Sequence, residues 1–146
     1  MPLATPMKSA VALALAISAT ASIAQTAAPA RFDGNWSVRI DCPSNSEPSG
    51  AKGYVYDFQA TVEKSFLSGT RGEQSAPGYL HIEGVIQPAG TAELHANGRT
   101  GNPDFAVKHP ASGSTYTYQI DAQFESTKGT GQRLKTRVCT FVFSKL

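Results

Sequence analysis

The chain has 146 residues, of which only 16% are charged, and its formal net charge is +2. So small a charge argues against nucleic-acid binding through bulk electrostatics. Thirteen glycines and nine prolines are typical of many short strands joined by tight turns, not of long helices.

The first segment of the chain predicts export. One lysine precedes an uncharged run at residues 9–23 that is rich in Ala and Leu, and Ser22 and Ala24 supply the small residues that signal peptidase requires. The run is shorter than the roughly 20 residues of a membrane-spanning helix. We therefore expect residues 1–24 to be a cleaved signal peptide and the mature chain to have no membrane span; an uncleaved anchor is the alternative.

The remaining residues have the length of one small domain. We expect residues 25–31 to form a flexible tail and residues 32–146 to form a single β-barrel domain. The only two cysteines are Cys42 and Cys139. Neither has a further ligand at metal-binding spacing, and in an oxidising compartment two such cysteines pair. The sequence therefore predicts a disulfide and a periplasmic or secreted location.

Eight runs of alternating apolar and polar residues follow the leader, and this alternation is typical of strands. A proline and a glycine at residues 87–90 stand where a hairpin turn requires them. We predict an all-β fold, an eight-stranded antiparallel up-and-down barrel closed by first-to-last strand pairing and by the disulfide. The predicted strands are residues 36–42, 54–62, 66–71, 80–86, 92–96, 104–108, 116–124 and 133–145.

The disulfide also predicts the register of the closing strands. With Cys42 opposite Cys139, the apolar faces of the two strands coincide and Trp36 lies opposite Lys145. The same register pairs Ile40 with Phe141 and Val38 with Phe143.

The longer connections are expected at one end of the barrel, because strand direction alternates along the chain. Long loops around an open mouth and tight turns at the other end are how ligand-holding barrels are usually built. We predict an open end formed by residues 43–53, 71–78, 98–103 and 126–132, and a closed end formed by residues 63–65, 87–90 and 109–114.

Gly34, Asn35 and Trp36 resemble the Gly-x-Trp motif of the calycin superfamily, which includes lipocalins, fatty-acid-binding proteins and avidins. In that family a cation from the last strand covers the Trp and seals the closed end, and Lys145 stands in that position here. The resemblance implies a small exported barrel and covers the chain from about Phe32 onward. It transfers no biotin site, because avidins surround biotin with several Trp residues and this chain has one. The chain also looks like small exported bacterial proteins, a likeness from which no function follows.

Cations gather at the predicted open end. Arg133, Lys135 and Arg137 share the inward parity of the disulfide, and a cationic rim above an apolar pocket suits an amphipathic anion. A bulge near Val138 would instead turn these cations outward and bring Leu134 inside. The predicted ligand-binding residues are Arg133, Lys135, Arg137, Tyr54, Phe124, Arg71 and Arg99.

The other inward aromatic residues are expected to fill the barrel, whose interior is only just wide enough for side chains. Tyr54 and Phe124 are the exceptions, because we place them nearest the mouth. The residues expected as filling include Tyr56, Phe58, Tyr116 and Tyr118.

The sequence predicts no catalytic residue, metal site or cofactor. No serine stands in a nucleophile-elbow sequence, and His81 and His95 lack a third ligand. We predict a non-enzymatic binding protein for a small amphipathic or anionic ligand. One alternative is an interaction module, such as an inhibitor of secreted proteases that acts through residues 25–31. The other is an envelope protein without a small ligand.

Overall fold

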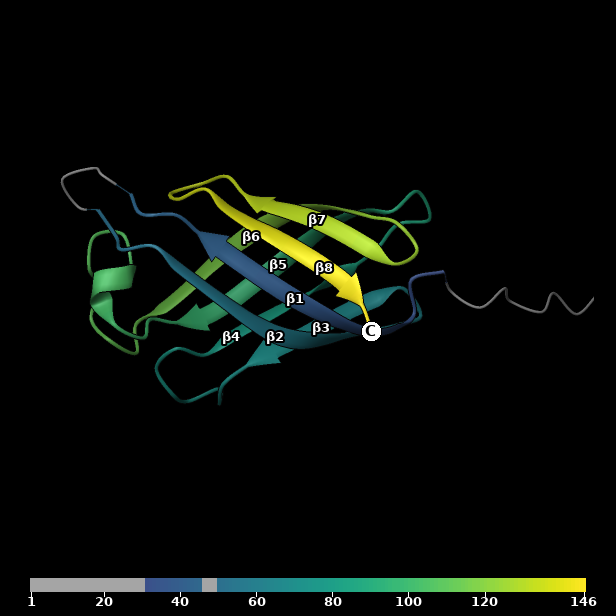
Figure 1. The fold of residues 1–146 in the computed structure, drawn as a ribbon. Coiled ribbons are helices and arrows are strands. Elements are labelled where there is room, and N and C mark those ends of the chain that lie inside the picture. Colours follow the sequence, from purple (N-terminus) through teal and green to yellow (C-terminus); the bar gives the residue numbers. More distant parts are fainter. Residues whose placement is uncertain (1–30, 46–49) are drawn as a thin grey trace, which may run out of the picture.

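The structure is a computed structural model that describes residues 31–45 and 50–146, so the predicted signal peptide and residues 25–30 lie outside the described residues. The chain forms a closed barrel of eight antiparallel strands, each paired with the next (Figure 1). The predicted fold class is confirmed. The strands are β1 (Gly34–Cys42), β2 (Tyr54–Glu63), β3 (Phe66–Arg71), β4 (Leu80–Val85), β5 (Thr91–Arg99), β6 (Thr115–Phe124), β7 (Lys128–Arg133) and β8 (Cys139–Lys145).

The closing pair has the predicted register. In the pairing of β1 with β8, Trp36 lies opposite Lys145 and Ile40 opposite Phe141. Cys42 and Cys139 form the disulfide, with Cα atoms 4.3 Å apart and 97 residues between them in sequence. Such a bond fits a protein that matures outside the reducing cytoplasm.

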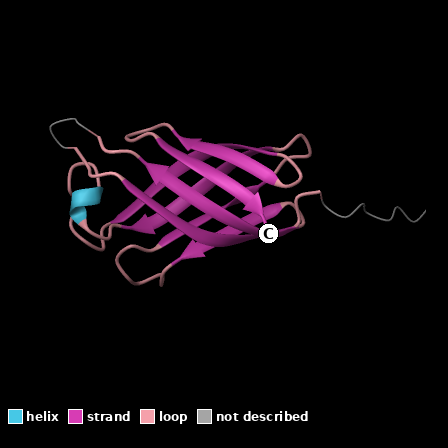
Figure 2. Ribbon diagram, viewed as in Figure 1, coloured by secondary structure: helices cyan, strands magenta, loops and turns pink. Residues whose placement is uncertain are grey.

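The predicted strand at residues 104–108 is wrong. Its first residues belong to a single-turn helix, η1 (Pro103–Phe105), within the connection between β5 and β6. Asn102 caps this turn by accepting a hydrogen bond from the Asp104 amide at 2.9 Å, and a proline starts it. It is the only helix in the described part of the chain (Figure 2), and no helix there is long and apolar enough to cross a membrane.

The predicted connection at residues 126–132 is also wrong, because most of these residues belong to β7. The last strand begins at Cys139 instead of residue 133. The inward positions of β7 are Gly129 and Gly131, which carry no alternating apolar signal. A Cβ at Gly129 would lie 2.6 Å from the Phe124 ring, so the glycine leaves the space that this ring occupies. The two errors cancel in the strand count.

The two errors do change which connections share an end. Residues 109–114 lie at the open end, and the turn after β6 lies at the closed end, so both placements are corrected. Among the described residues, the open end consists of residues 43–45, 50–53, 72–79, 100–114 and 134–138, and the closed end of residues 64–65, 86–90 and 125–127 (Figure 1). The longer connections do gather at one end.

The interior near the closed end is filled by large apolar side chains. The Trp36 ring lies 5.6 Å from that of Phe124, which lies 4.8 Å from that of Phe143. The Trp36 Nε1 donates a hydrogen bond to the Phe32 carbonyl at 2.9 Å, and all four side chains are at most 2% exposed. Lys145 Nζ lies 6.0 Å from the Trp36 ring centre, so this cation has the predicted position beside Trp36.

Candidate functional site

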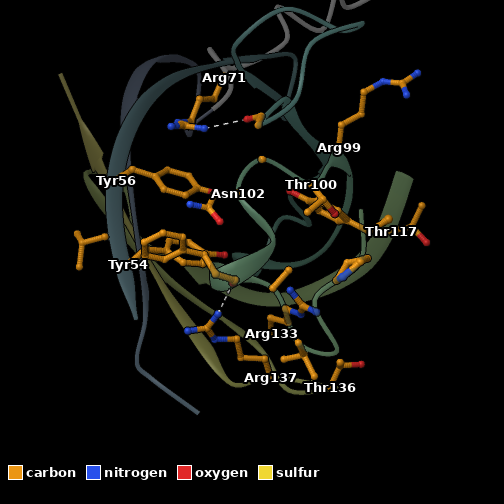
Figure 3. Close-up of a pocket in the computed structure, with 18 residues that line it drawn as sticks. Tyr54, Tyr56, Arg71, Arg99, Thr100, Asn102, Thr117, Arg133, Thr136 and Arg137 are labelled. Carbon is orange, nitrogen blue, oxygen red and sulfur yellow. Dashed lines mark hydrogen bonds between the residues drawn. The ribbon is translucent and has the colours of Figure 1, made fainter. Parts of the chain in front are cut away.

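The interior near the open end is hollow. It contains a cavity of about 570 Å³, within the range of roughly 300–1,000 Å³ that is typical of ligand sites. Four arginines and no acidic side chain line it. Its lining residues are Tyr54, Val55, Tyr56, Arg71, Gly78, Arg99, Thr100, Gly101, Asn102, Phe105, Ala106, Val107, Pro110, Tyr116, Thr117, Arg133, Thr136 and Arg137 (Figure 3).

Two pairs of tyrosines face each other across the barrel. Tyr54 and Tyr56 lie two residues apart on the inward face of β2, and their rings stack with centres 5.1 Å apart and planes 4° apart. Tyr116 and Tyr118 alternate along β6 and stack at 5.9 Å with planes 8° apart. In a closed barrel of eight strands, β2 and β6 are half a turn apart, so the pairs lie on opposite walls. We call these four residues the tyrosine walls; Tyr54, Tyr56 and Tyr116 line the cavity directly, whereas Tyr118 stacks on Tyr116 and is not a lining residue.

The position of Tyr116 depends on a glycine. Gly98 on β5 pairs with Tyr116 on β6, and a Cβ at Gly98 would overlap the Tyr116 ring. The glycine thus lets this ring lie across the neighbouring strand.

Burial keeps three hydroxyls of the tyrosine walls neutral. It raises the pKa of Tyr116 to about 12 and also raises the pKa of Tyr56 and of Tyr118 above the usual value. None of the wall hydroxyls has a hydrogen-bond partner among the described residues. The phenols of Tyr56, Tyr116 and Tyr118 therefore remain protonated at physiological pH and can donate hydrogen bonds.

Two arginines are held against the walls and keep unused donors. The Arg71 guanidinium carbon lies 4.2 Å from the Tyr56 ring centre, and Arg133 lies at the same distance from that of Tyr118. Arg71 Nη1 donates to the Gly78 carbonyl at 2.8 Å, and Arg133 Nε to the Lys135 carbonyl at 3.3 Å. Neither guanidinium pairs with a carboxylate in the described part of the chain.

Arg137 connects parts of the open end to one another. It is 6% exposed and donates to the Phe105 carbonyl at 2.8 Å, which ties the helical turn to the barrel rim. Its Nη2 lies within 3.1 Å of three further carbonyls, those of Cys42, Pro43 and Lys52. Burial lowers the pKa of this guanidinium from its usual value.

Arg99 also connects loops. Its Nε donates to the Gln74 carbonyl at 2.8 Å and its Nη1 to the Gly113 carbonyl at 3.2 Å. In Figure 3 its side chain extends away from Tyr54 and Tyr56. Most donors of Arg137 and Arg99 are thus engaged by backbone, whereas Arg71 and Arg133 keep two unused donor nitrogens each.

The structure brings most of the predicted site together. One cavity is lined by five of the seven predicted residues: Tyr54, Arg71, Arg99, Arg133 and Arg137. Residues 134–138 form a connection between β7 and β8, so neither the continuous strand nor the bulge near Val138 is present. The other two predicted residues, Lys135 and Phe124, do not line it.

The predicted place of Phe124 at the mouth is wrong. The strand wrongly placed at residues 104–108 reversed the expected direction of β6, whose last residue, Phe124, lies at the closed end against Trp36. Lys135 lies in an exposed connection, where strand alternation does not apply.

Three aromatic lining residues were not predicted as ligand-binding. Tyr56 and Tyr116 were expected to fill the barrel, and Phe105 was assigned to the false strand. The two-residue spacing of Tyr56 from Tyr54 was the available signal, because it places both rings on one face.

Comparisons with protein-family models, with curated proteins and with solved structures find no match for this chain. The function of the protein is therefore inferred from the chemistry of the cavity.

Proposed function

We propose that this protein is a non-enzymatic binding protein that holds a small anionic molecule in the cavity at the open end. The observation that carries the proposal is the lining itself, which has four arginines and no carboxylate. Hydrogen bonds from guanidinium groups to anions are about twice as strong as neutral ones. An anion bound there would also offset the mutual repulsion of the cations.

The distribution of the interior side chains supports a binding site over a structural barrel. A barrel of eight strands is normally filled by its own side chains. Here the half near Trp36 is filled, and the half near Tyr54 and Tyr56 is hollow. The hollow half also holds the cations, as expected where a ligand completes the packing.

We place this activity in the periplasm or outside the cell. The disulfide and the predicted leader at residues 1–24 both favour export. A calycin-like relationship is consistent with Lys145 above Trp36. Intact-mass measurement of the protein from its host tests the leader, because a chain that starts at Gln25 is expected.

Native mass spectrometry of the protein purified from its own host tests the proposed function. We expect a retained small molecule on the wild-type protein and none on the Arg71→Gln/Arg133→Gln double variant. Arg39→Gln is the matched control, because Arg39 is exposed on the outer face and pairs with Asp57 at 3.1 Å. Empty wild-type protein that also ignores added anions would contradict the proposal.

A further inference from the structure

We infer that the ligand is a compact, flat dianion whose ring lies between the tyrosine walls and whose two acidic groups bind Arg71 and Arg133. This inference rests on the proposed function and specifies its ligand class.

The depth of the cavity favours a compact molecule over a long-chain one. Directly below the tyrosine walls, Ile40, Ile120 and Phe141 are at most 1% exposed. The Tyr118 and Phe141 ring centres are 6.4 Å apart, so wall and floor are in contact. Below them Trp36 closes the barrel. An alkyl tail that entered from the open end would therefore meet packed side chains, and native packing leaves few voids larger than a water molecule.

The walls favour a flat molecule. The rings within each pair are nearly parallel, at 4° and 8°, and the two pairs stand on opposite sides of the barrel. The ring faces are occupied within each pair and by the arginines above Tyr56 and Tyr118, so the walls offer ring edges, and edge-to-face contact is an arrangement that aromatic rings favour. A flexible chain of equal charge would lose conformational freedom on entering and gain less from these rings.

The two available arginines favour two negative groups. Arg71 ends β3 and Arg133 ends β7, and these strands are also half a turn apart in the barrel. The tyrosine beneath each guanidinium holds it in place, at 4.2 Å in both cases. Arg71 keeps Nε and Nη2, and Arg133 keeps Nη1 and Nη2, free of described partners. Each arginine therefore offers two donors, the number that bidentate binding of a carboxylate needs.

Isothermal titration calorimetry with four probes tests the inference. Naphthalene-2,6-dicarboxylate has the inferred shape and charge, 2-naphthoate lacks one charge, octanedioate lacks the ring, and laurate has a long tail. We expect the naphthalene dicarboxylate to bind about tenfold or more tightly than each of the others, because a charge-assisted hydrogen bond contributes about the 1.4 kcal/mol that a tenfold change requires.

Single variants test whether each arginine binds one acidic group of the ligand. Arg71→Gln and Arg133→Gln should each lower the affinity for naphthalene-2,6-dicarboxylate to about that of 2-naphthoate, while Arg39→Gln should leave it unchanged. Thermal unfolding of each variant confirms that the barrel is intact. A single arginine variant with wild-type affinity would overturn the inference.

The remaining outcomes separate this inference from the proposed function. If laurate binds most tightly, or if 2-naphthoate and the dicarboxylate bind equally well, the inference of a flat dianion is overturned. The proposed function, binding of a small anion, would still stand. Failure of all four probes would also overturn the dianion, and the mass of the host-purified protein then decides the proposed function separately.

Discussion

The two ends of the barrel share one wall but have opposite interiors. At the closed end Trp36, Phe124 and Phe143 are at most 1% exposed and in ring contact. At the open end the inward residues of β2 and β6 are tyrosines that are only partly buried. The backbone alternation is identical, so the difference comes from the side chains and from the longer loops. Apolar packing at one end provides the stability that lets the other end remain hollow.

Removal of the disulfide is expected to have the largest effect, and it tests whether the hollow end needs a covalent bond. Cys42 and Cys139 lie at the open end, where side-chain packing is weakest. For a closed span of 97 residues, chain-entropy models give about 4–5 kcal/mol. Urea unfolding of the Cys42→Ser/Cys139→Ser variant should show a loss of this size. A loss below about 1 kcal/mol would mean that packing alone holds the rim.

A pair of aromatic truncations compares the two ends directly. Trp36→Ala should lower the free energy of unfolding by about 3–5 kcal/mol, because a fully buried ring leaves a cavity. Tyr56→Ala should cost about 1–2 kcal/mol, because that ring already borders open space. Urea unfolding measures both. Equal losses would contradict the division into a filled and a hollow half.

Arg137→Gln tests how the open end is held together. The substitution leaves the carbonyl groups of Cys42, Pro43 and Lys52 without their charged donor. Hydrogen bonds to charged groups contribute about 1.5–3 kcal/mol each and are not additive, so we expect a net loss of about 2–3 kcal/mol in urea unfolding. Lys135→Gln, in the same connection but exposed, is the matched control and should change stability by less than about 0.5 kcal/mol.

The last prediction concerns the alkaline limit of stability and has no effect at neutral pH. The folded-state pKa of Tyr116 is about 12 and those of Tyr56 and Tyr118 are also raised, whereas unfolded tyrosines titrate near about 10. Their contribution is therefore fully present below about pH 10 and is lost as pH rises toward about 12. Urea unfolding at a series of pH values should show this decline, and Tyr116→Phe should reduce it. A flat profile in the wild-type protein would contradict the burial of these phenols.

The sequence was sufficient for the fold and for most of the site. The cysteine pair set the register of β1 and β8, alternation located Tyr54, and the position beside a connection located Arg71. Arg133 was predicted in the last strand but ends β7. Alternation failed for β7, because the inward residues Gly129 and Gly131 give no apolar signal. It also failed at residues 104–108, where the Asn102 cap and the proline after it favour a helical turn. The first failure reflects packing between β6 and β7, because the Phe124 ring fills the space beside Gly129. The second reflects a capping signal next to the run, which alternation alone does not take into account.

A titration of protein with labelled tyrosine and tryptophan side chains tests the central claim most directly. The chain has five tyrosines and one tryptophan, and four of those tyrosines form the walls of the open end. With naphthalene-2,6-dicarboxylate as the probe, NMR should show shifts of the ring signals of Tyr54, Tyr56, Tyr116 and Tyr118. The Trp36 indole signal, at the closed end, should stay in place. Shifts of Trp36 without shifts of the tyrosine walls would contradict a filled closed end and a ligand-binding open end.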